Sequence, residues 1–113
     1  MSADRQPQRD VYAGDLAIPT GPLTVVRAIF EVRAELDPGA LTRVAATLAF
    51  SNVAPARLGC ERDAPSEMLI TAVLDGVTAV AAELILRKLQ QLTVVVEATL
   101  RCEEMPRRVV ASP

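Results

Sequence analysis

The residues best suited to chemistry in this 113-residue chain are Asp37, Pro38, Gly39 and Ala40, which join an alternating segment to an amphipathic one. Asp37 is suited to the N-cap of a helix, where a carboxylate accepts a bond from a free amide of the first turn. Pro38 fits the first helical position, since it has no N–H to leave unpaired and its φ is already helical. Gly39 leaves the turn without a side chain, so an anion could approach the positive end of the helix dipole. The motif is either a carboxylate- or phosphate-binding turn or simply a tight strand-to-helix connection.

The composition excludes several kinds of site. Histidine is absent, which removes the commonest general base and the commonest metal ligand. The two cysteines, Cys60 and Cys102, are far apart in the chain, so we expect free thiols in a reducing cytoplasm. The formal charge of −2 comes without a basic face or an aromatic ladder, which argues against nucleic acid as a partner. We therefore expect no catalytic residue, no metal and no cofactor, and a protein that is not itself an enzyme.

Hydrophobic periodicity predicts the elements that position the turn. Strict alternation over residues 26–36 indicates a strand with one covered face. Asn52 is suited to the left-handed position that ends the following helix, and Asp75-Gly76 is expected to end the third strand. The predicted order is strand, helix, strand, strand, helix, strand, at residues 26–36, 38–50, 56–62, 67–75, 77–92 and 93–100.

Two strand–helix–strand halves with right-handed crossovers give one four-stranded antiparallel sheet with both helices on one face. The first and third strands are then central, and the second and fourth are the edges. We interpret residues 1–22 and 102–113 as flexible tails. No apolar run is long enough to span a membrane and no signal segment is visible, so we expect a soluble, cytoplasmic protein without membrane contact.

Two surfaces of this predicted fold are candidates for a partner. The core must be built from small aliphatic side chains, so we expect oligomerisation to add burial, as a homodimer through the poorly protected edge of the second strand. On the helix-free face, Ile29, Leu69 and Val73 would form an exposed apolar patch beside Arg57, which suggests a second protein contact. Alternatively, the arginines of this face simply meet solvent.

Two segments carry a resemblance to a known family. Leu-Asp-Pro-Gly-Ala-Leu-Thr-Arg-Val (36–44), in this order of elements, resembles the ACT domain and in particular the small regulatory subunit of acetohydroxyacid synthase (acetolactate synthase). The segment 87–95 is similar to a Leu-x-Lys-Leu-Val-x-Val run of those subunits, and the likeness covers residues 24–100. It implies a ferredoxin-like α+β fold, with an ACT-like domain at 23–101. It also implies side-by-side dimers and a catalytic partner subunit that performs the thiamine-diphosphate chemistry.

The resemblance further implies a site for a small amino-acid effector, valine in particular, at the dimer interface. Gly39 and Ala40 match the backbone that meets the effector's carboxylate, and Asp37 belongs to the same turn. Asn52 stands where the family has a glycine after the first helix. The family's two effector-binding asparagines are replaced by Leu36 and Ala54, so the polar grip on the headgroup is lost.

Three functions follow from this comparison of residues. The first is a regulatory subunit that binds and activates a catalytic subunit of branched-chain amino-acid biosynthesis, with weak or absent valine feedback. The second is a free-standing sensor of altered specificity, for a less polar acid or amino acid. The third is a structural dimerisation module whose cavity is closed by Leu36 and by the partner chain.

Overall fold

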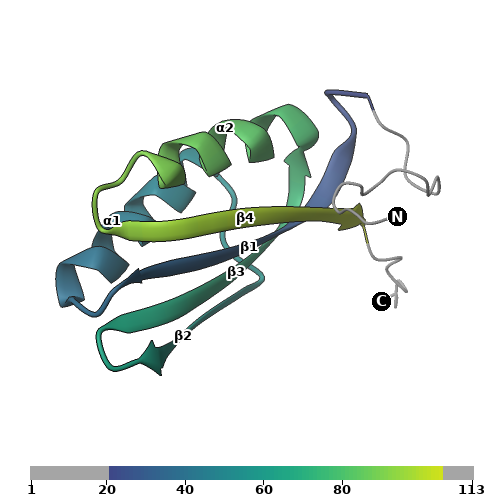
Figure 1. Cartoon of the computed structure of the whole chain (residues 1–113). Coiled ribbons are helices and arrows are strands. Elements are labelled where there is room, and N and C mark those ends of the chain that lie inside the picture. The colour runs from purple at the N-terminus through teal and green to yellow at the C-terminus, as the bar shows by residue number, and fades with distance from the viewer. Residues whose placement is uncertain (1–20, 106–113) are drawn as a thin grey trace, which may run out of the picture.

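Both helices lie on one face of a four-stranded antiparallel sheet and leave the other face open (Figure 1). The computed structural model describes residues 21–105. The strand order β2-β3-β1-β4 confirms that the first and third strands are central and the other two are edges. The elements are β1 (Val25–Glu35), α1 (Pro38–Leu48), the short 3-10 helix η2 (Ala49–Ser51), β2 (Arg57–Ala64), β3 (Glu67–Thr78), α2 (Ala79–Gln90) and β4 (Val95–Glu104).

Strand β1 is the centre of the hydrophobic core. Its even-numbered residues from Val26 to Ala34 face the helices and are at most 2% exposed, as strict alternation predicts. Phe30, fully buried, lies between Ala72 of β3 and Leu100 of β4 in the sheet register. Across the sheet, α1 adds Ala40, Val44 and Leu48 to the same core. The aliphatic core expected from the composition is thus assembled around one aromatic ring.

The pairing of β1 with β3 continues beyond Asp75-Gly76, so the prediction that these residues end the third strand is wrong. Val26 pairs with Val77 and Arg27 with Asp75, which leaves Gly76 as an extra residue in β3. Gly76 has φ +90°, a conformation that glycine adopts without a Cβ penalty. The strand therefore bends through a β-bulge and runs on to Thr78, whose hydroxyl then caps α2 by accepting a bond from the Ala81 amide.

We expect Gly76→Ala to lower the free energy of unfolding by about 1–2 kcal/mol, because an L-residue is strained at positive φ. A Cβ at this position would meet no atom within 4 Å, so the cost comes from the backbone rather than from a clash. Denaturant unfolding would measure it. Gly59→Ala is the matched control, since a Cβ there is equally free and Gly59 lacks a positive φ. Equal effects of the two substitutions would contradict this account.

Strand β4 also departs from the simple pattern. Its pairing with β1 shifts between Arg33 and Ala34, and Val96, which alternation predicts to face inward, is 56% exposed. The strand extends to Glu104, so residues 102–104 are paired with β1 and do not belong to a tail. The remaining tail predictions, for residues 1–20 and 106–113, lie outside the described residues.

The start of α2 is anchored by the segment that precedes β1. The amides of Ala79 and Val80 donate to the carbonyls of Thr24 and Pro22. Val80 and Leu84, which the helical spacing suggests are buried, are 44% and 52% exposed; the buried face of α2 is instead Ala82, Ile85 and Leu89. Within residues 21–105, no helix combines the length and the apolar character needed to cross a membrane.

Candidate functional site

The turn before α1 has the predicted backbone but not the predicted cap bond. Asp37 occupies the N-cap with extended backbone angles and Pro38 is the first helical residue, yet the Asp37 side chain accepts no capping bond. Its Oδ2 instead lies 3.1 Å from where a Cβ on Gly39 would be. The amide of Ala40 donates to the Asp37 carbonyl at 2.9 Å, and Ala40 is fully buried. The space above the turn thus already holds one carboxylate of the chain itself.

The six predicted effector residues separate into two groups. Leu36, Asp37, Gly39 and Ala40 are at the N-terminal end of α1, whereas Asn52 and Ala54 follow its C-terminal end. The helix has 11 residues, or about 16 Å at the usual rise, so these groups do not meet within one chain. Leu36 is anchored by its amide to the carbonyl of Ser66, and its side chain is 39% exposed.

Asn52 has the left-handed conformation that the sequence predicts for the residue ending the first helical segment. It has φ 59° and ψ 22°, the left-handed conformation that asparagine tolerates better than most residues. Ser51 fixes the next step, because its hydroxyl accepts a bond from the Val53 amide and donates one to the Val53 carbonyl. The Ala56 amide then donates to Val73 of β3, which brings the chain back to the sheet.

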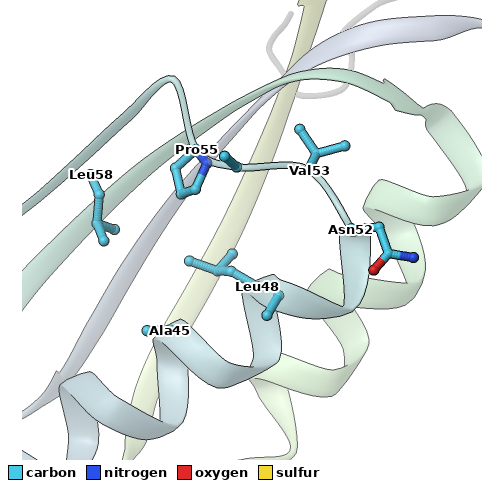
Figure 2. Close-up of a pocket in the computed structure, with 8 residues that line it drawn as sticks. Ala45, Leu48, Asn52, Val53, Pro55 and Leu58 are labelled. Atoms are coloured by element: carbon cyan, nitrogen blue, oxygen red, sulfur yellow. The ribbon is translucent and has the colours of Figure 1, made fainter.

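This reversal encloses one side of a pocket between α1 and β2 (Figure 2). The cavity volume is about 380 Å³, within the range of small-molecule sites. Asn52 has the only polar side chain in its lining, which consists of Ala45, Leu48, Ala49, Asn52, Val53, Ala54, Pro55 and Leu58. The predicted site residues Asn52 and Ala54 are therefore brought together, in a cavity that is otherwise apolar.

The remaining lining residues were not identified from the sequence. The small side chains of Ala45, on α1, and Ala49, the first residue of η2, lie four residues apart and form the wall toward β2. Leu58, 47% exposed, forms the opposite wall. The two alanines, four residues apart, are the feature of the sequence that could have indicated the pocket, because small residues on one face of a helix leave room for a cavity beside it.

The predicted partner-binding residues share the helix-free face. Ile29 pairs with Val73, and Val73 with Arg57, so these three form one row across β1, β3 and β2. Leu69 lies on the same face but four residues from Val73, about 13 Å along β3. The apolar patch expected here is thus divided into two parts, and its side chains are half-buried.

Two arginines of this face are neutralised within the chain. Arg27 donates two bonds to Asp75, at 2.6 and 3.0 Å, which raises the pKa of its guanidinium. Arg33 bonds Asp63 and Glu97 and also lies 3.5 Å from Glu67. For Arg27 and Arg33, these pairs favour the interpretation as solvated ion pairs within the chain rather than docking residues.

Neither cysteine belongs to a candidate site. Both are free, with Cys60 exposed on β2 and Cys102 partly covered. Burial, and then the nearby charge of Glu83, raises the pKa of the Cys102 thiol, which keeps it protonated and poorly nucleophilic. No group of acidic or thiol side chains able to hold a metal ion occurs in the described part of the chain.

Comparisons with known proteins agree with this architecture. The ACT domain from the GTP pyrophosphokinase of Chlorobium tepidum is similar with TM-score 0.60 and 9% identity, over 69% of this chain and 100% of that one. The C-terminal domain of the MgtC protein from Mycobacterium tuberculosis gives 0.59 and 20%, over 71% and 89%. A homoserine dehydrogenase from Thiobacillus denitrificans gives 0.64 and 17%, over 87% of this chain but 22% of that one. No curated protein matches the sequence.

The order of elements and of strands defines a ferredoxin-like α+β domain with an open sheet face. A family model described as an ACT-like domain matches residues 23–107, and the chain belongs to this family. ACT domains are regulatory modules that bind small molecules, and they commonly dimerise. The ACT-like, ferredoxin-like fold predicted from the sequence is confirmed.

Proposed function

We propose that the chain is a non-catalytic regulatory subunit, similar in role to the small subunit of acetohydroxyacid synthase. It forms a homodimer through β2 and activates a catalytic subunit of branched-chain amino-acid biosynthesis, with weak or absent valine feedback. One observation supports the proposal: in this ACT-like domain, a single polar residue, Asn52, lines the pocket between α1 and β2.

The pocket explains the weak feedback. A free amino acid carries an ammonium and a carboxylate, and each needs a partner when it leaves water. Leu36 and Ala54 offer neither, and the Asp37 carboxylate beside Gly39 repels an incoming anion. Valine therefore gains contact with the apolar wall but loses the hydration of both its charges.

Exposure supports the β2 edge as the dimer interface. Seven of the eight β2 residues are exposed, and within residues 21–105 the strand pairs only with β3. An unpaired strand edge is a template for a second copy. In antiparallel pairing of two copies, directly opposed residues point to the same face, so the twofold axis passes through a residue near the middle of β2.

Charge favours an axis at Cys60 or at Gly59. Arg57 opposes a carboxylate of the other copy in both cases, Asp63 in the first and Glu61 in the second. With the axis at Glu61, two carboxylates oppose each other. We propose the Cys60 axis, which the cross-link below tests. The Cys60 register also sets the α1 helices side by side in opposite directions. The Gly39 turn of one copy then lies on the side of the Asn52–Ala54 loop of the other, so the dimer completes the effector site.

The register predicts a specific cross-link. Opposed residues in an antiparallel pair have Cα atoms about 4.5–5.5 Å apart, within the range of disulfides. Mild oxidation of the Cys102→Ser variant is expected to give covalent dimers through Cys60. Cys60→Lys is expected to abolish the edge dimer in sedimentation velocity, because it opposes two ammonium groups, whereas Cys60→Ser leaves it intact. Absence of cross-linking together with an unchanged Cys60→Lys dimer would refute the register.

The regulatory role is tested by reconstitution. The chain is co-expressed with the acetohydroxyacid synthase catalytic subunit of its own organism. We expect co-purification, a several-fold higher synthase activity, and a change of less than twofold in that activity on adding valine. A catalytic subunit that neither binds the chain nor gains activity would refute the proposal, and strong valine inhibition would refute its feedback part.

The apolar pocket favours a second candidate, a free-standing sensor of a less polar acid. Thermal-shift measurements against branched 2-oxo acids and amino acids test it. A shift with the oxo acids that is lost in Ala45→Phe, which fills the cavity, would support it. A flat response across the panel leaves the regulatory subunit as the better account.

A further inference from the structure

The geometry points to a second self-association surface: we propose that the open face of the sheet packs against the open face of another copy of this chain. This contact is separate from the β2 edge and requires no catalytic partner, so it goes beyond the proposed function. It is carried by the arrangement of charge on the helix-free face.

The central part of this face has three parallel rows, fixed by the strand register, and a further charged row flanks them on each side: Arg27 with Asp75 and Glu103, and Glu35 with Glu67. The first row has an arginine at each end and two aliphatic residues between them. The third row has a glutamate at each end, with Leu69 and Arg33 between them. The middle row separates these two and is mostly small or uncharged. In strand order β2, β3, β1, β4, the rows are Arg57, Val73, Ile29, Arg101; Gly59, Thr71, Glu31, Thr99; and Glu61, Leu69, Arg33, Glu97.

A twofold axis along the middle row makes the face complementary to itself. Rotation about this axis turns the second copy over and places its third row above the first row, with each residue facing its counterpart on the same strand. Arg57 then faces Glu61 of the second copy, and Arg101 faces Glu97 of the second copy. Because the contact is isologous, each of these pairs occurs twice.

The apolar residues match in the same arrangement. Val73 faces Leu69 of the second copy, while Ile29 faces the aliphatic stem of Arg33 of the second copy. Ile29 and Val73 line a hollow of about 420 Å³ on this face, with Arg57 and Arg101 on its borders. Two sheets that pack face to face lie about 10 Å apart, which side chains of this length span.

The other twofold arrangements of the two faces bring like charges together. An axis along the strands, between β1 and β3, would place Arg57 over Arg101 and Glu61 over Glu97. An axis along either outer row would oppose identical charges at both ends of that row. The chosen axis leaves two kinds of unfavourable contact, between Glu31 and Glu31 of the second copy and between Asp75 and Glu67 of the second copy, while Arg27 faces Glu35 of the second copy favourably. Accordingly, Glu31→Gln is expected to strengthen the association.

The test uses the β4 pair, which is far from the β2 edge. In a Cys60→Lys background, which lacks the edge dimer, sedimentation velocity is expected to show twice the 12.1 kDa mass of the chain. Adding Arg101→Glu opposes two glutamates and is expected to raise the dimer Kd at least tenfold. Adding Glu97→Arg to that variant restores the attraction with reversed signs and should restore the dimer. Arg101 and Glu97 are exposed and make surface ion pairs within their own chain, Arg101 with Glu103 and Glu97 with Arg33. Surface ion pairs contribute little to stability, so the fold should tolerate both changes.

Mixing provides the sharpest readout. The Arg101→Glu and Glu97→Arg single variants should each dissociate alone, yet an equimolar mixture should form heterodimers. Thermal melts of every variant confirm that the chains remain folded. A Cys60→Lys variant that stays monomeric up to about 0.1 mM, a concentration at which even a weak dimer would be populated, would overturn the proposal. So would a dimer that Arg101→Glu leaves unaffected, or a mixture of the two single variants that does not associate.

Discussion

Phe30→Ala is expected to lower the free energy of unfolding by about 3–5 kcal/mol, the cost of removing a buried aromatic ring and leaving a cavity. Phe30 is fully buried in β1, which lies between β3 and β4, and its side chain is on the face that the helices cover. Domains of this size are stable by about 5–15 kcal/mol. A single truncation thus removes a large share of the stability, which urea denaturation followed by circular dichroism would measure.

The other phenylalanine is a matched control. Phe50 is 66% exposed in η2, and its ring lies 4.7 Å from the Lys88 ammonium. An exposed cation–π contact contributes about 0.5–1 kcal/mol. Phe50→Ala should therefore cost no more than this. If the two alanine variants unfolded at the same urea concentration, the core would not depend on Phe30 as the structure indicates.

The second large effect is a gain of ligand response. If the proposed function is right, introducing the two asparagines with Leu36→Asn and Ala54→Asn is expected to produce valine binding stronger than that of the natural chain. Both positions are exposed, so polar side chains should not disturb the core. At a valine concentration ten times Kd, binding stabilises the folded state by about 1.4 kcal/mol. For a domain of this size, this corresponds to a rise in melting temperature of about 5 °C.

Controls for this gain come from the dimer. Each single substitution should give a much smaller shift, because the two asparagines contact the same ligand from different copies. Adding Cys60→Lys to the double variant should remove the valine shift, which is measured against the melting temperature of the same triple variant without valine, because loss of the dimer lowers that temperature by itself. A double variant that does not respond to millimolar valine would contradict the proposal that the absence of the two asparagines weakens valine binding.

Periodicity predicted the fold because each element buries one face. The alternation around Phe30 indicated which face of β1 is buried, and the order of elements limited the sheet topology to a few arrangements. The bulges were not predicted, since Asp75-Gly76 is equally compatible with a turn and with a bulged strand. Only the pairing of Val77 with Val26, across the sheet, decides between them.

The candidate site was predicted in part. Asn52 could be assigned its left-handed conformation from residue type alone, and the structure confirms it. The cavity could not be predicted, because it forms where Ala45 of α1 and Ala49 of η2 meet Leu58 of the separate strand β2. Nor does residue type reveal that the carboxylate of Asp37 lies beside Gly39.

The exposure of β2 has a consequence for local unfolding. The strand lies at the sheet edge, no helix covers it, and seven of its eight residues are exposed. Amide hydrogen exchange should therefore be fastest among the strands in β2, through openings that cost far less than global unfolding. A second copy paired with this edge would suppress those openings. Because Leu58 of β2 forms one wall of the pocket, assembly of the dimer would then also fix the shape of that pocket.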